Sequence, residues 1–362
     1  MRHKQFVIST TLASTLLVTT IHAAPPPDGP AIIAIGSIGG SYEDFATQTA
    51  APLESGLPGN RLGGLGSGLA HLGGDYFLAL SDRGPNANDY DDCNNALDDT
   101  TSFINRFHTM HLSLAPSDPG SILPFTLTPM LAGTTLLSAH EPLAYGAGCG
   151  GAHSGAPALN AVDHTHYFTG RSDNFDPNRS SGFARDARLD PESIRVSRDR
   201  RHVYISDEYG PYLYEFDRLT GERTGVFTLP PKFFVSVLSS HGDTEISGNR
   251  SGRVANKGME GLAITPSGKT LVGAMQSALI QDGGDVKGGV TRIVTIDIES
   301  GRTYEYAYQL DTSTKTTISD ILAIKITSFS STSATVKVVR TRPARRPCSS
   351  ACIGSICASR RT

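Results

Sequence analysis

The chain has no tryptophan and few charged residues, and each shortage restricts the fold classes that fit the sequence. Charged residues make up 19% of its 362 residues, whereas glycine occurs 38 times and proline 21 times. This composition favours many short strands joined by tight turns over long amphipathic helices. Beyond residue 24 we find no apolar run long enough to span a membrane. We therefore expect an all-β protein in which tyrosine and phenylalanine supply the aromatic packing.

Cysteine is also scarce, because only Cys93 and Cys149 precede Lys325. Both lie in loop-like stretches rich in aspartate or glycine. In an oxidising compartment such a pair is typical of one disulfide, which in a chain-entropy model stabilises the fold by about 4 kcal/mol. Two unrelated thiols are the alternative.

Residues 1–24 have the build of a signal peptide. Arg2 and Lys4 make a positive start, residues 6–21 are uncharged and largely apolar, and small residues follow. The alternative is an amphipathic or membrane-anchoring helix, but the run is short and rich in threonine for a span of about 20 apolar residues. Cleavage would send the mature chain to the periplasm or out of the cell.

One strand–turn–strand phrase occurs three times, at residues 66–85, 190–217 and 259–276. Apolar residues alternate within each copy, and Gly, Pro, Asp and Ser bound the runs, which is typical of strands and hairpins. Repeats of this kind without intervening helices indicate a radially repeated sheet. We therefore predict an all-β, β-propeller-like fold of about six blades over residues 25–324.

The repeats place carboxylates at equivalent strand ends. Glu192 and Glu260 share a position near the start of the first strand, and Asp82 and Asp207 share the end of the second. In a propeller such positions face one another around a channel, and oxygen ligands suit calcium. The alternative is that each acid only caps its own turn. We predict a metal site formed by Asp82, Glu192, Asp207, Glu208 and Glu260.

Basic residues lie next to these acids. Arg83 follows the first of them, and the long insertion at 230–257 carries Arg253 and Lys257 just before Glu260. A loop of this length is either functional or disordered. We predict that these three cations steady the charge of an anionic substrate, and that Glu260 is a catalytic residue as well as a ligand. The sequence has no G-x-S-x-G elbow, which argues against an acyl-enzyme.

Residues 325–362 differ from the rest of the chain. They hold eight of the 32 lysines and arginines, three of the five cysteines, and no aspartate or glutamate. One interpretation is a basic, disordered interaction tail. We favour a reading-frame change near Ile324, because residues 318–324 begin another strand-like pattern that the tail does not complete. The ring would then stay open and expose a sheet edge, and an intact frame on resequencing would refute the idea.

Several phrases together resemble the phytase-like family of exported bacterial proteins, known for "esterase-like activity of phytase". They are LALSDRGP (78–85), TGRSDNFD (169–176), LDPESIRVS (189–197), VYISDEYGPYLYEFD (203–217) and NKGMEGLAITPSGKTLVGAMQSALIQD (256–282). The resemblance covers about residues 60–324. It implies a propeller-like fold and hydrolysis of phosphate or carboxylic esters.

The function that we expect is calcium-assisted hydrolysis of a phosphoester in the periplasm or outside the cell. The mature chain would act as a monomer on a small anionic substrate, with no nucleic-acid or membrane partner. The alternative is a propeller binding module that holds a cationic or metal-bearing ligand without turnover. In a third possibility, the acids are structural and calcium only stiffens the ring.

Overall fold

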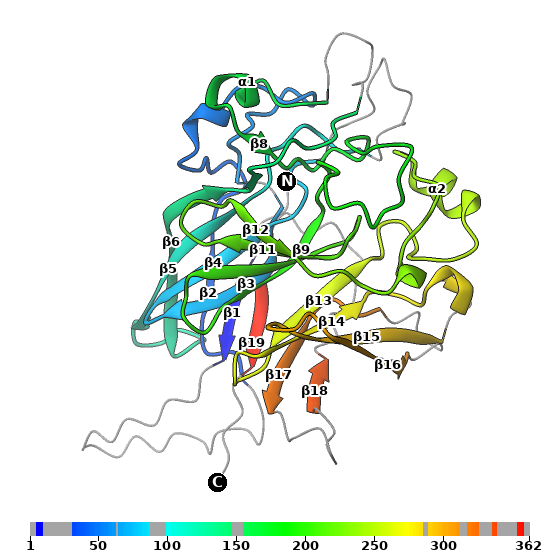
Figure 1. Cartoon of the computed structure of the whole chain (residues 1–362). Helices are drawn as coiled ribbons and strands as arrows, with labels where there is room; N and C mark the ends of the chain where they lie inside the picture. Colours follow the sequence, from blue (N-terminus) through cyan, green and yellow to red (C-terminus); the bar gives the residue numbers. More distant parts are fainter. Residues whose placement is uncertain are drawn as a thin grey trace.

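The structure is a computed structural model of the whole chain. It describes residues 5–9, 31–62, 64–86, 99–146, 155–284, 289–310, 317–325, 335–338 and 353–357. Three four-stranded antiparallel sheets contain most of its strand residues (Figure 1), so the β-rich character predicted from composition is confirmed. Cys93 and Cys149 lie outside the described residues, and their disulfide stays a prediction.

Within each sheet the strands follow one another in sequence order. The first sheet contains β3 (Leu65–Gly73), β4 (Tyr76–Ser81), β5 (Arg106–Pro116) and β6 (Phe125–Leu136). The second contains β9 (Pro191–Val196), β10 (His202–Asp207), β11 (Leu213–Asp217) and β12 (Arg223–Val226). The third contains β13 (Met259–Ile264), β14 (Thr270–Met275), β15 (Val290–Asp297) and β16 (Thr303–Gln309). The three copies of the repeated phrase therefore begin the three sheets.

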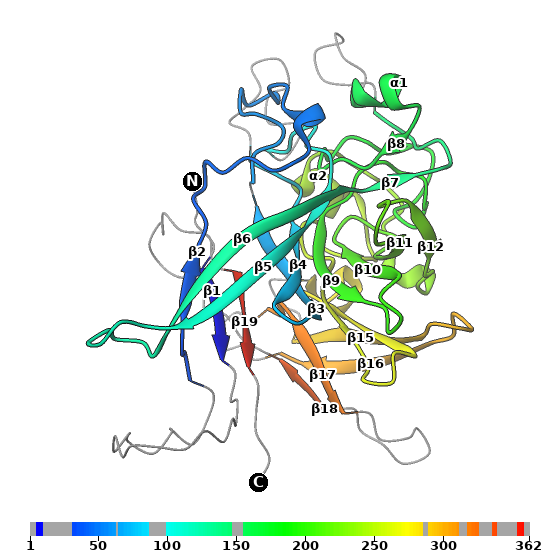
Figure 2. The same cartoon turned by 90° about the vertical axis from the view of Figure 1, so that its left-hand side faces the viewer.

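Short elements complete the described chain. The helices are α1 (Leu159–Asp163) and α2 (Gly242–Gly248), with 3-10 turns at Thr47–Thr49, Pro231–Phe233 and Ile280–Asp282. The remaining strands are β1 (Gln5–Ser9), β2 (Ile35–Ser37), β7 (Ser138–Ala139), β8 (His166–Tyr167), β17 (Ile321–Lys325), β18 (Thr335–Val338) and β19 (Ile353–Cys357). In both views α1 lies at the upper end of the molecule and α2 lies below it (Figures 1 and 2).

The sheets pack face to face in sequence order. Alternate residues of a strand point to opposite faces, so each sheet offers an apolar face to both neighbours. Leu80 of the first sheet and Ile194 of the second share one core, and Leu213 and Leu262 share the core between the second and third sheets. The third sheet in turn packs on Ile321 of β17. Each such buried side chain contributes on the order of 2 kcal/mol.

The first strands of the sheets lie next to one another, because β9 contacts both β3 and β13, and β13 contacts β17. Glycines permit this approach. A Cβ at Gly68 would lie 2.7 Å from the backbone nitrogen of Ile194, and one at Gly261 would lie 3.2 Å from the side chain of Ile321. This succession of first strands is what brings their ends, and the acids on them, to one place.

A complete ring stays a prediction. The described residues contain three four-stranded sheets, the three-stranded sheet of β19, β1 and β2, and the pairs β17–β18 and β7–β8, so three sheets have four strands against the six blades expected. In the tail, β18 pairs with β17 and β19 pairs with β1, and the disorder predicted for residues 325–362 stays a prediction. β1 lies within the predicted signal peptide and also pairs with β2. Cleavage after residue 24, like the frame change near Ile324, stays a prediction.

Candidate metal site

Five acids meet where the first strand of a sheet begins or the second strand ends. Glu192 is the second residue of β9 and Glu260 the second of β13, whereas Asp82 and Glu208 directly follow β4 and β10. Asp190 directly precedes β9. We call this set the acidic site.

A β-bulge explains how the two strand glutamates are aimed. Ser193 pairs with Ser206 and Pro191 with Asp207, which leaves Glu192 as the extra residue between them. The third sheet repeats this irregularity, since Met259 and Gly261 pair with consecutive residues of β14 and leave Glu260 unpaired. The first sheet has its bulge between Leu65 and Gly68, around Ser67. Because a bulge re-aims the unpaired side chain, the position that the repeat alignment singled out is the bulged residue of each sheet.

The acidic site contains two groups of carboxylates that share Glu192. Asp82, Asp190 and Glu192 form the first group, and Glu192, Glu208 and Glu260 form the second. Within each group, one ligand atom per residue lies within 4.8 Å of the others. This spacing fits oxygen ligands around a hard cation. The predicted convergence of these acids is therefore what the structure shows, apart from Asp207.

Two buried oxygens in the site have no hydrogen-bond partner. One is Oδ1 of Asp190, a residue that is 1% exposed, and the other is Oε1 of Gln276, whose Nε2 donates to Glu260 Oε2 at 2.9 Å. A buried oxygen without a donor costs about 1–3 kcal/mol. A cation held by Asp82, Asp190 and Glu192 would satisfy Asp190 Oδ1, and the donor set of the site therefore fits a metal.

The protonation of the acidic site also favours a cation. Burial is the largest cause that raises the pKa of Asp190, Glu192, Glu208 and Glu260, and neighbouring carboxylates raise the pKa of Glu192 and Glu260 further. Burial and mutual repulsion both penalise the ionised form of these carboxyls. A bound cation would offset both.

Asp207 was predicted to be a metal ligand, but in the structure its carboxylate accepts hydrogen bonds from backbone N–H groups. It accepts hydrogen bonds from the backbone nitrogens of Asp190 at 3.0 Å, Tyr209 at 3.0 Å and Gly210 at 2.8 Å. It belongs to neither carboxylate group. Asp207 thus holds the turn that delivers Glu208 and the segment that delivers Asp190.

The three predicted cations differ in their access to the site. Arg83 borders it, because its Nη1 donates to Asp190 Oδ2 at 2.9 Å and to Asn256 Oδ1 at 2.8 Å. Lys257 follows Asn256 directly, is partly buried, and forms no ion pair with any residue that the structure describes. Arg253 is 1% exposed and is held by Glu245 and the carbonyl of Tyr209, so it does not face solvent.

Sequence reasoning missed two residues of the site. Asp190 was interpreted only as a turn acid, and the repeat could not reveal it because the corresponding residue before β13 is Gly258. Gln276 aligns with Arg83 and Glu208 at the position after the second strand, and all three of these residues touch the site. Their shared position in the repeat was the signal from which Gln276 could have been assigned to the site.

A serine–histidine pair directly before Asp82 offers no nucleophile. Ser81 Oγ lies 3.1 Å from His108 Nε2, and both residues are fully buried. Burial, with a smaller contribution from Arg106, lowers the pKa of His108 to about 3. A serine closed off in this way cannot attack a substrate, which agrees with the sequence-based argument against an acyl-enzyme.

The fold and the site define a β-sheet protein with an acidic site that could hold a metal ion. A family model described as "Phytase-like: Esterase-like activity of phytase" matches residues 60–331. The chain belongs to this phytase-like family, as the resemblance of its motifs indicated.

The chain is also similar to an uncharacterized secreted protein of Arthroderma benhamiae, with 34% identity over 137 residues. The match covers 33% of this chain and 26% of that protein. Because this relative is fungal, the bacterial source implied by the motifs stays an expectation. Among solved structures, hydrazine synthase of Kuenenia stuttgartiensis matches 68% of this chain and 50% of its own, with a TM-score of 0.25 and 11% identity. That likeness carries no argument about fold or function.

Among the described residues, no helix is long and apolar enough to cross a membrane. The secreted relative fits the predicted export of this chain, and the choice between periplasm and exterior stays open to experiment.

Proposed function

We propose that this protein is an exported, calcium-assisted phosphoester hydrolase. The family to which it belongs is of hydrolase type, and its name refers to phytase, which supports a phosphate ester as substrate. The observation that carries the proposal is the pair of carboxylate groups sharing Glu192, with the unpartnered Asp190 Oδ1 beside them. Ligands that are all oxygen favour calcium over softer metals.

Two cation positions follow from the grouping. Asp82, Asp190 and Glu192 would hold one calcium ion, and Glu192, Glu208 and Glu260 would hold the other, with Glu192 common to both. Bound calcium would polarise the phosphoryl oxygen and lower the pKa of a water molecule.

The residues of the chain itself bind and orient the substrate. We assign Lys257, which forms no ion pair with the described residues, to binding the phosphate. Arg83 holds Asp190 and Asn256 in place and adds positive charge to the same side of the site. Gln276 fixes the carboxylate of Glu260, which we assign as the group that takes the proton of the attacking water.

The test is hydrolysis of p-nitrophenyl phosphate and of phytate by the full chain after chelation and after return of calcium. We expect activity to disappear in chelator, to return with calcium, and to stay at background in Glu192→Gln. The control is Glu299→Gln, which removes an exposed carboxylate in the β15–β16 turn. Unchanged activity in chelator would refute the metal role.

The burial of Asp190 and Glu208 favours a second candidate, in which calcium ties the sheets together and no turnover occurs. Glu208 Oε1 accepts the backbone N–H of Gly258 at 3.1 Å, so the site already joins the second sheet to the third. This candidate predicts that calcium raises the melting temperature of a protein without phosphatase or esterase activity.

A further inference from the structure

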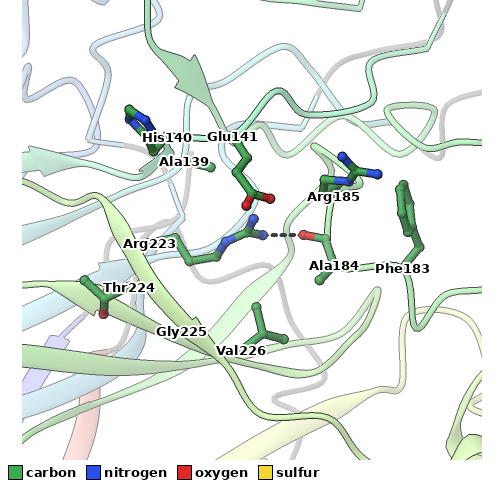
Figure 3. A pocket seen from close by; sticks show the side chains of 10 residues that line it. All are labelled: Ala139, His140, Glu141, Phe183, Ala184, Arg185, Arg223, Thr224, Gly225 and Val226. Atoms are coloured by element: carbon green, nitrogen blue, oxygen red, sulfur yellow. Dashed lines mark hydrogen bonds between the residues drawn. The ribbon is translucent and has the colours of Figure 1, made fainter.

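A cavity of about 460 Å³ lies between β7 and β12, apart from the acidic site (Figure 3). Residues 139–141, 183–185 and 223–226 line it, and none of them belongs to the acidic site. Its volume falls in the range of pockets that hold small molecules.

Two arginines in this cavity have no carboxylate partner among the described residues. Arg223 is fixed in place: it donates to the carbonyl of Ala184, and its guanidinium lies 5.4 Å and 5.6 Å from the ring centres of Phe168 and Tyr214. Arg185 is exposed and lies 5.2 Å from the ring of Phe183. The first guanidinium is therefore preorganised, and the second is available at the rim.

One carboxylate, Glu141, also lines the cavity, and it forms no ion pair in the described structure. Figure 3 shows Glu141, Arg185 and Arg223 around the same space. Two arginines and one glutamate are thus the acidic and strongly basic side chains that line the cavity. Guanidinium groups match the planar, bidentate geometry of carboxylates and also bind phosphate.

We propose that this cavity is a second binding site, for a small oxyanion held between Arg185 and Arg223. Phe183, Val226 and Ala139 offer apolar surface for the body of the ligand. The site is independent of the proposed hydrolytic function, since it shares no residue with the acidic site.

The experiment is calorimetric titration of the chelated full chain with inorganic phosphate in one arm and succinate in the other. We expect binding in at least one arm, weakened at least about tenfold in Arg185→Ala. Glu141→Gln, which removes the opposing charge, should tighten binding by about two- to fivefold. Binding of phosphate alone would indicate a phosphorylated ligand, and binding of succinate alone a carboxylic acid.

Arg179→Ala is the matched control, because Arg179 lies 5.3 Å from the same Phe183 ring but does not line the cavity. Arg179→Ala should leave the affinity unchanged. The proposal is overturned if neither anion binds at about 10 mM, a concentration at which even weak pockets fill. Equal losses in Arg179→Ala and Arg185→Ala would also overturn it.

Discussion

Two buried clusters of charged residues lie close together in this protein, and they differ in whether guanidiniums or carboxylates are in excess. The first is the acidic site, and the second, which we call the arginine cluster, consists of Glu245, Arg188 and Arg253. In the arginine cluster one carboxylate accepts two guanidiniums, at 2.6 Å from Arg253 and 3.4 Å from Arg188. In the acidic site several carboxylates face one close guanidinium, that of Arg83.

The pKa values of the acids separate the two clusters. Burial by itself would raise the pKa of Glu245, but Arg253 and Arg188 outweigh it, and the pKa is lowered. Burial raises the pKa of Glu192 and Glu260, and neighbouring carboxylates raise it further. The comparison teaches that burial alone does not mark a functional site. The carboxylate of the arginine cluster is paired with two guanidiniums, whereas the carboxylates of the acidic site outnumber the guanidiniums paired with them and would be stabilised by a cation.

We expect the largest loss of stability from a substitution in the arginine cluster. Arg253→Met leaves Glu245 buried with one weaker partner, and removal of one partner of a buried ion pair typically costs about 3–5 kcal/mol. We expect this loss in the free energy of unfolding, measured by urea denaturation, with calcium and without it. A loss seen only in the presence of calcium would mean that Arg253 belongs to the acidic site.

Calcium should produce the next largest effect, and only through the acidic site. At a calcium concentration about 100 times the Kd, binding stabilises the native protein by about 2.7 kcal/mol. We expect chelation to lower the melting temperature of the wild type accordingly. Glu192→Gln should abolish the calcium dependence, and Glu299→Gln should retain it.

Asp186 is buried but belongs to neither cluster. The shift of its pKa predicts that the stability of the protein depends on pH. Burial raises its pKa to about 7, although the backbone N–H of Asp176 and the charge of Arg188 act in the other direction. Between about pH 4 and pH 7 the native protein holds a proton that the unfolded chain releases, so this contribution to stability is lost as pH rises. We expect a loss on the order of 2 kcal/mol, after relaxation around the charge.

The control for this pH effect is Asp186→Asn, measured in saturating calcium so that the acidic site does not contribute. The stability of the variant should fall less than that of the wild type from pH 4 to pH 8. Parallel pH profiles of the two proteins would contradict the assignment.

The smallest effect concerns Lys257, which the proposal places against the substrate and not in either cluster. Lys257→Ala should reduce kcat/KM for a phosphoester by roughly tenfold, which corresponds to about 1.4 kcal/mol. The melting temperature and its response to calcium should stay unchanged. An equal loss with an uncharged carboxylic ester would show that the lysine does not act on phosphate.

The repeated phrase was enough to predict much of this arrangement. Its period predicted the strands, and its alignment predicted that Glu192 and Glu260 occupy equivalent positions, which the structure shows to be bulges. The alignment could not separate Asp207 from Glu208, because consecutive residues at a strand end point in different directions. Only the structure shows that the first serves the backbone and the second the site.

Arg253 shows that ion pairs within a long loop could not be predicted from the sequence. Its position in a long, polar insertion before Glu260 suggested a substrate contact, but its partner Glu245 is brought to it by α2 of the same insertion. Pairing within a loop depends on how the loop folds, which no strand period predicts. The cavity beside β12 was missed for a similar reason, since its arginines come from two separate segments.

The most direct test of the acidic site is a calorimetric titration of the chelated full chain with calcium at neutral pH. We predict saturable binding of two ions with release of protons, lost in Glu192→Gln because that carboxylate serves both positions. The absence of binding to the wild type, or binding that survives unchanged in Glu192→Gln, would contradict it.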